Sequence, residues 1–85
     1  MAPKSLKKIQ VRYFALLREE RGVSEETVST SARSLKELYF SLKEKHGFSL
    51  ATDILKVAVN QEFKDWSASL HDGDCVVFIP PVAGG

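Results

Sequence analysis

The chain has 85 residues, a net charge of +1 and one cysteine. A chain of this length forms one domain that buries about 60 % of its unfolded surface, so we expect a thin but sufficient core and no large catalytic domain. Basic and acidic residues are interspersed, so the composition predicts no binding of nucleic acid or of an anionic membrane. No apolar run approaches the ~20 residues that span a bilayer. The lone cysteine and the lack of a secretory signal favour a cytoplasmic protein.

The first predicted element is a strand over residues 8–14. Its apolar residues Ile9, Val11 and Tyr13 alternate with polar ones, which is typical of a strand with one buried face. The same alternation places Phe14 on the opposite face of the sheet.

The next segment, residues 15–26, is polar, and Gly22 interrupts it. We therefore expect a connection with no more than a helical turn over residues 16–20. Residues 26–31 predict a weak second strand around Val28, which would complete a hairpin with the first strand.

The clearest element is a helix over residues 34–47. Ser34 is a good N-cap, and Glu37, three residues later, completes a capping box. Gly47 is placed to end the helix. The apolar residues recur at helical spacing and form one buried stripe: Leu35, Leu38, Tyr39 and Leu42.

Residues 54–61 alternate again and predict the third strand. Its buried face would carry Leu55, Val57 and Val59. The segment that follows, up to residue 70, is predicted to be a connection and carries Phe63.

Residues 75–79 predict the last strand, after a turn at Gly73. This strand is apolar on both faces, with Val76 and Phe78 on one and Cys75, Val77 and Ile79 on the other. The order strand, strand, helix, strand, strand predicts an α+β fold of the ubiquitin-like β-grasp kind. It has a mixed sheet, the first and last strands side by side in its centre, and one main helix packed across one face.

The chain is expected to divide into three segments. Residues 1–8 form a disordered N-terminal extension, residues 9–79 the β-grasp domain, and residues 80–85 an extended, flexible tail. Pro80 and Pro81 fix φ near −65° and lack an N–H group, so they end the ladder of the sheet.

The tail itself suggests a function. Gly84 and Gly85 have no Cβ and can thread a passage that is too narrow for a side chain. They would present the carboxylate of Gly85 inside another protein, where activation by adenylation would make it electrophilic.

An apolar patch is expected at the root of this tail. If the helix covers the face of Val76 and Phe78, then Phe14, Val77 and Ile79 lie together on the other face, and Phe63 is a candidate to join them. Such a patch predicts a docking surface. The alternative is that a loop buries these residues.

No residue pattern indicates a catalytic or metal centre within the chain itself. His46, at a helix end, and His71, in a turn, are expected to have structural roles. Cys75 lies in a strand without a basic neighbour, which favours a packed or partly exposed thiol over a nucleophile.

Three stretches, RYFALLRE, AVNQ and LHDGDCVVFIPPVAGG, resemble the small subunits of molybdopterin synthase, the sulfur carriers of molybdenum cofactor biosynthesis. The resemblance covers residues 9–85. It implies that an E1-like enzyme adenylates Gly85 with ATP and that Gly85 then becomes a thiocarboxylate. The tail would insert into the large subunit and donate sulfur to a cyclic pterin precursor.

The resemblance also implies a heterotetramer of two small and two large subunits. The small subunit would have no active site of its own and no stably bound cofactor. Partner contacts are implied at Phe14, Phe63 and Ile79, and the chain carries Ile79 where the family often has an aromatic residue. Arg18 matches an arginine of the family and is a candidate interface residue, with a solvated surface charge as the alternative.

Three other functions stay open at this stage. A ubiquitin-like modifier would join Gly85 to lysines, and a sulfur carrier could serve thiamine, cysteine or tRNA thiolation. The RYFALLRE opening argues against the latter group. A passive β-grasp binding module would not need Gly84 and Gly85 at all.

Overall fold

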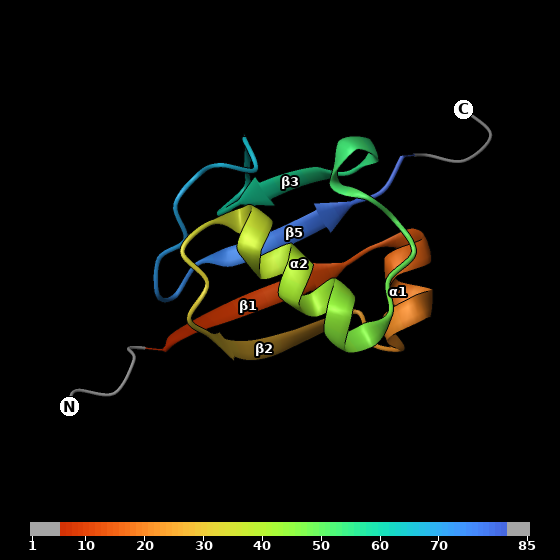
Figure 1. Cartoon of the computed structure of the whole chain (residues 1–85), viewed down its shortest axis with the longest axis horizontal. Helices are drawn as coiled ribbons and strands as arrows, with labels where there is room; N and C mark the ends of the chain where they lie inside the picture. Colours follow the sequence, from red (N-terminus) through yellow and green to blue (C-terminus); the bar gives the residue numbers. More distant parts are fainter. Residues whose placement is uncertain (1–5, 82–85) are drawn as a thin grey trace.

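The computed structural model describes residues 6–81, in which a five-stranded sheet packs with two α-helices (Figure 1). In chain order the elements are β1 (Lys7–Tyr13), α1 (Ala15–Arg21), β2 (Glu25–Thr30), α2 (Leu35–His46), the 3-10 turn η1 (Thr52–Ile54), β3 (Lys56–Val59), β4 (Glu62–Lys64) and β5 (Cys75–Ile79). Neither α-helix within residues 6–81 has the length and apolar character needed to cross a membrane.

The sheet is mixed, with the strand order β2-β1-β5-β3-β4. The central strands β1 and β5 are parallel, with Tyr13 beside Phe78, and the other neighbours are antiparallel. The prediction that the first and last strands lie side by side in the centre is confirmed.

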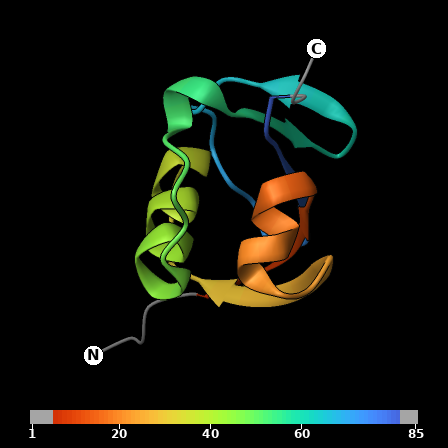
Figure 2. The ribbon, with the colours of Figure 1, turned by 90° about the vertical axis from the view of Figure 1, so that its right-hand side faces the viewer.

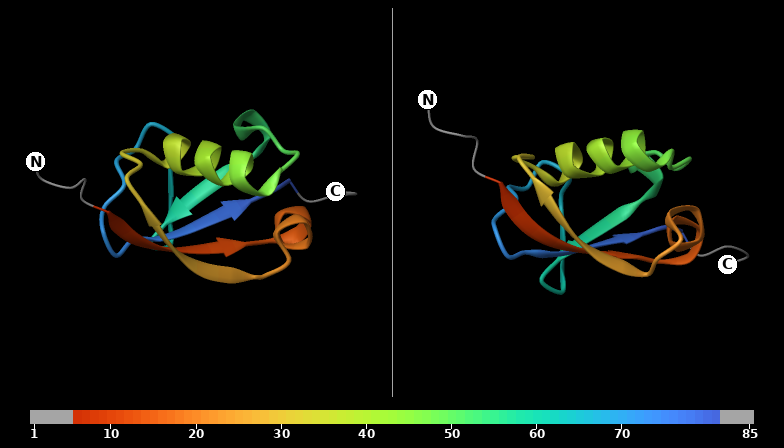
Figure 3. Two further views of the ribbon diagram at one scale, coloured as in Figure 1. Left: turned by 60° about the horizontal axis from the view of Figure 1, so that its bottom comes forward. Right: turned by 90° about the horizontal axis from the view of Figure 1, so that it is seen from below.

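Helix α2 lies across one face of the sheet (Figure 3). Its predicted stripe is buried, with Leu35, Leu38 and Tyr39 fully inaccessible to solvent. The facing residues of the central strands are equally buried: Ile9, Val11, Tyr13, Val76 and Phe78. Burial of apolar side chains is the main stabilising contribution to such a domain.

The caps of α2 explain its limits. The Ser34 hydroxyl accepts a hydrogen bond from the Glu37 N–H at 3.2 Å, as the sequence predicts. The Glu37 carboxylate accepts from the Arg33 N–H at 3.0 Å, one residue before the usual partner in a capping box. Gly47 ends the helix with φ of 72°, a left-handed conformation that glycine adopts without strain.

Helix α1 is longer than the single turn that the sequence predicts. It is anchored by Leu17, which is completely buried, and it ends at Gly22, whose N–H donates to the Arg18 carbonyl at 2.8 Å. One buried side chain in seven residues gives no apolar periodicity, so the helix depends on tertiary packing.

Strand β4 is a second difference, because its residues are predicted to be part of a connection. Asn60 and Gln61 have φ of 51° and 74° and form a tight turn that pairs Glu62–Lys64 with β3. All three residues of β4 are exposed, so the strand leaves no alternating pattern. The third strand begins at Lys56 instead of residue 54, because η1 precedes it.

The N-terminal boundary also differs. Strand β1 begins at Lys7, so the last two residues of the predicted extension belong to the sheet. The backbone of Lys8 is held by the turn before β5: its N–H donates to Asp72 Oδ1 at 2.7 Å, and its carbonyl accepts from the Gly73 N–H at 2.8 Å.

Candidate functional site

The open face, which we define as the sheet face opposite α2, carries the second set of β5 side chains. Cys75, Val77 and Ile79 are partly exposed there, whereas Val76 and Phe78 are completely buried beneath α2. None of the described helices lies across the open face, since α1 lies at the end of the sheet (Figure 2). The prediction that Val76 and Phe78 face the helix while Cys75, Val77 and Ile79 lie on the other face is therefore confirmed.

An apolar strip, made of Val77, Ala58 and Phe63, crosses three strands of the open face. Val77 of β5 is in register with Ala58 of β3, which is in register with Phe63 of β4. Phe63 is 69 % exposed, the largest value among the bulky apolar residues described. Phe63 and the partly exposed Val77 are therefore available to a partner, while Ala58 between them is buried, and Phe63 projects most from the strip.

A second apolar feature, the tail-root groove, lies where β1 and β5 end. Its volume is about 570 Å³. It is lined by Phe14, Ala15, Leu16, Glu19, Leu50, Ile79, Pro80 and Pro81. Phe14 is 45 % exposed and Leu16 42 %, so two large apolar side chains border the point where the chain leaves the sheet.

The structure thus brings Phe14 and Ile79 together in the groove and places Val77 and Phe63 in the neighbouring strip. Arg18 is not among the residues that line the groove. It is exposed on α1, and its carbonyl accepts the N–H of Gly22 where the helix ends. The interface roles of these five residues stay predictions. Pro80 is buried and Pro81 is exposed at the edge of the groove.

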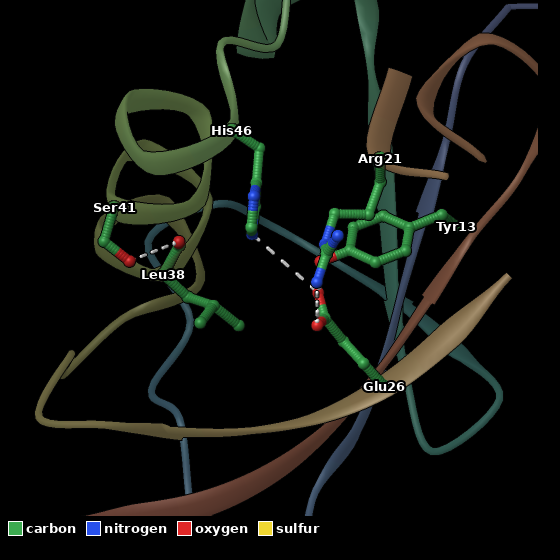
Figure 4. A network of polar contacts seen from close by, with 6 residues as sticks. All are labelled: Tyr13, Arg21, Glu26, Leu38, Ser41 and His46. Carbon is green, nitrogen blue, oxygen red and sulfur yellow. Dashed lines mark hydrogen bonds and ion pairs between the residues drawn. The ribbon is translucent and has the colours of Figure 1, made fainter. Parts of the chain in front are cut away.

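A polar network holds α1 in place behind this site (Figure 4). Glu26 of β2 accepts hydrogen bonds from Arg21 of α1, at 2.9 Å and 2.7 Å, and from the Tyr13 hydroxyl of β1, at 2.6 Å. His46, at the end of α2, lies 4.0 Å from the same carboxylate. Four elements therefore meet at one carboxylate.

The environment shifts the pKa values of this network. Hydrogen bonds from Arg21 are the main reason that the pKa of Glu26 is lowered. Burial, more than the nearby Glu26, raises the pKa of Tyr13, and burial lowers the pKa of His46. Glu26 is thus charged and Tyr13 is a hydrogen-bond donor at neutral pH, while His46 is neutral.

No cluster of metal-ligating side chains occurs within residues 6–81. Cys75 is a free, partly exposed thiol, and its N–H donates to Asn60 Oδ1 at 3.1 Å. His71 is exposed and lies 3.9 Å from Asp74, whose carboxylate accepts the His71 N–H at 2.8 Å in the turn. The partial exposure of Cys75 agrees with the prediction. His71 takes part in the turn through its backbone N–H while its side chain is mostly exposed, so a structural role for that side chain stays a prediction.

Comparison with known proteins identifies the family. A sequence model of the ThiS family matches residues 11–85. The chain is 32 % identical to the molybdopterin synthase sulfur carrier subunit of Escherichia coli K12, over 91 % of this chain and 99 % of that protein. The chain belongs to the ThiS family.

Solved structures resemble this ThiS-family protein over most of its length. A Helicobacter pylori complex of subunits 1 and 2 of molybdopterin-converting factor contains a chain that is 33 % identical, with a TM-score of 0.62 and coverage of 92 % of this chain and 99 % of that one. SAMP1 of Haloferax volcanii is 23 % identical, with a TM-score of 0.77 and coverage of 92 % and 99 %. A ubiquitin from Caldiarchaeum subterraneum is 15 % identical, with a TM-score of 0.63 and coverage of 95 % and 100 %. The latter two show the fold alone, and they confirm the ubiquitin-like β-grasp prediction.

Four residues that line the tail-root groove of this ThiS-family protein were not predicted as site residues: Ala15, Leu16, Glu19 and Leu50. The first three fall in a segment predicted to be a connection, and no element is predicted at Leu50. Leu16 carries a weak signal, because it is apolar and follows Phe14 by two residues. Gly84 and Gly85 lie outside the described residues, so their predicted roles are not addressed by the geometry.

Proposed function

We propose that this protein is the sulfur carrier subunit of a molybdopterin synthase. The observation that carries the proposal is the match, over nearly the whole length of both chains, to sulfur carrier subunits of that enzyme in Escherichia coli and Haemophilus influenzae. The family model also extends to residue 85 and so includes the Gly-Gly tail.

The arrangement of apolar surfaces supports this role. The tail-root groove includes Pro80 and Pro81, which begin the tail, and the apolar strip lies beside it on the open face. A partner that covers both surfaces would hold the root of the tail in a fixed position. The proline pair is stiff, and six residues from Pro80 to Gly85 reach at most about 20 Å, so the carboxylate would be delivered to a defined depth.

The proposed chemistry takes place at Gly85. Its carboxylate attacks the α-phosphate of ATP in an E1-like enzyme, which releases pyrophosphate and leaves an acyl-adenylate. A sulfide equivalent then displaces AMP and gives a thiocarboxylate. The sulfur of this group attacks a carbon of the cyclic pterin precursor in the large subunit and displaces an oxygen substituent there. Water then cleaves the bond between the carbonyl carbon of Gly85 and the sulfur, which leaves the sulfur on the pterin and restores the Gly85 carboxylate. The carrier thus supplies the reagent, and the partner supplies the catalytic residues.

The proposed partner is the large synthase subunit, in a complex of two small and two large chains. The Helicobacter pylori complex of subunits 1 and 2 supports a partner of this kind. The molybdopterin product carries a dithiolene group with two sulfur atoms, so each product molecule requires two sulfur transfers from the carrier.

The test is a reconstitution. Thiocarboxylated protein, the large subunit and the pterin precursor should yield molybdopterin, whereas the variant that lacks Gly85 should yield none. A matched control is Phe40→Ala, which alters an exposed residue of α2 and should retain full activity. Product formation by the Gly85 deletion, or isopeptide adducts on lysines in place of sulfur transfer, would contradict the proposal.

A further inference from the structure

Two basic residues border the apolar surface of β5 from opposite sides. Arg12 of β1 is in register with Val77, and Lys56 of β3 is in register with Ile79. Register partners point to the same face of a sheet, and neighbouring strands are about 4.8 Å apart. Each of the two apolar residues that β5 presents therefore has one cation beside it on the open face.

The row that contains Arg12 extends across the whole apolar strip. Its order is Arg12, Val77, Ala58 and Phe63, on β1, β5, β3 and β4. Three strand spacings make this row roughly 14 Å long. Lys56 is two residues from Ala58 along β3, and it lines a hollow of about 640 Å³ together with Phe63.

Both cations lack an ion-pair partner among the described residues. Glu25 is in register with Arg12 on β2, but no ion pair joins them within residues 6–81, and the Glu25 carboxylate accepts a hydrogen bond from Gln10 Nε2 at 2.6 Å. Asp65 lines the hollow near Lys56 without an ion pair to it, and Lys64 in the same hollow is already paired with Glu62 at 3.4 Å.

A partner that covers the strip therefore also covers or borders the charged groups of Arg12 and Lys56. The aliphatic stems of arginine and lysine can lie along apolar surface while their charged groups reach its rim. If a partner covered these charged groups without a counter-charge, they would lose their hydration without gaining an ion pair, which is strongly unfavourable. A carboxylate of the partner beside each cation would supply that ion pair.

We propose that Arg12 and Lys56 select a partner whose apolar contact surface is bordered on both sides by Asp or Glu side chains, and that this partner is the large subunit. The inference rests on the proposed function and adds the charge pattern of the docking surface. Rim charges of this kind act mainly on the rate of association and on the choice of partner, and salt screens them.

The test compares two double variants of the full chain that change the net charge equally. Arg12→Glu with Lys56→Glu reverses both rim charges, and Lys36→Glu with Lys45→Glu reverses two exposed lysines of α2. Association with the large subunit is followed by stopped flow at low and high salt. Melting curves of all variants establish that each is folded.

The rim variant should associate about 10-fold more slowly at low salt, and its rate should rise with added salt. The wild type and the α2 variant should associate rapidly, and their rates should fall with added salt. A wild-type rate and salt dependence for the rim variant would overturn the inference.

A third variant separates this inference from the proposed function. Phe63→Asp places a charge in the apolar strip itself. If it loses binding while the rim variant binds normally, the charge pattern is wrong and the docking surface stands. If it also binds normally, the open face is not the docking surface. If the rim variant affects only the E1-like enzyme, the choice of the large subunit is wrong.

Discussion

Replacing Tyr13 by Phe tests the polar network that fixes α1 beside the tail-root groove. The change removes one hydroxyl, which donates to Glu26 at 2.6 Å from a completely buried ring. Hydrogen bonds to charged groups contribute about 1.5–3 kcal/mol. Because Arg21 still donates to the carboxylate, the lower end applies, and the loss should be about 1.5 kcal/mol.

The matched control is Tyr39→Phe. Its ring is also completely buried, but its hydroxyl donates to a neutral acceptor, the Leu50 carbonyl, at 2.7 Å. A neutral hydrogen bond contributes about 1 kcal/mol. For a domain of this size each kcal/mol lowers Tm by about 4–8 °C, so Tyr13→Phe should lose roughly 9 °C and Tyr39→Phe roughly 6 °C at pH 7.

The pH dependence separates the two variants more sharply. The pKa of Glu26 is lowered in the folded protein, chiefly by hydrogen bonds from Arg21. Stability from this carboxylate is therefore present above its unfolded pKa of about 4.3 and is lost as pH falls through the folded pKa. Both tyrosines stay protonated throughout, since burial raises the pKa of Tyr13 and raises that of Tyr39 to about 12.

Urea unfolding at pH 7 and near pH 2.5 measures the effect. The difference between the wild type and Tyr13→Phe should shrink at the lower pH, because a larger fraction of the Glu26 carboxylate is protonated there. The difference for Tyr39→Phe should not change. Equal losses for the two variants at both pH values would refute the argument that Glu26 acts as a charged acceptor.

Three further predictions concern the apolar strip, the turn between β3 and β4, and the C-terminal tail. Phe63→Asp removes a contact that we expect to contribute about 2 kcal/mol to binding, so the Kd for the large subunit should rise by about 30-fold in a calorimetric titration. Phe40→Asp, on the exposed side of α2, should leave this Kd unchanged. Gln61 has a φ of 74°, a left-handed conformation that glycine adopts without strain, so Gln61→Gly should raise the free energy of unfolding by about 1 kcal/mol. An unchanged urea midpoint would contradict this. Gly84→Ala should reduce sulfur transfer without lowering Tm, because it lies beyond the last strand; a parallel loss of both would show a structural role.

The fold could be predicted from the sequence where side-chain periodicity reports burial. The apolar residues that α2 buries, and the alternation of buried and exposed residues along β5, both follow from the spacing of apolar residues in the sequence. Strand β4 and helix α1 could not be predicted in this way, because β4 has no buried residue and α1 has only Leu17. Their formation depends on pairing with β3 and on packing at the end of β1.

The site shows the same division. Parity alone placed Phe14, Val77 and Ile79 on the side opposite the core residues. The position of Phe63 in the strip needed the register between β3 and β4, and the positions of Arg12 and Lys56 beside β5 needed two further registers. Registers link residues far apart in the chain, and an alternating pattern does not specify them.

The most direct test of the central claim is the intact mass of the protein after incubation with ATP, its E1-like enzyme and a sulfide source. The account predicts a gain equal to the exchange of one oxygen atom for one sulfur atom, which fragmentation maps to Gly85 and which disappears when the large subunit and the pterin precursor are added. An unchanged mass, with an activating enzyme that consumes ATP in the presence of this chain, would contradict the account.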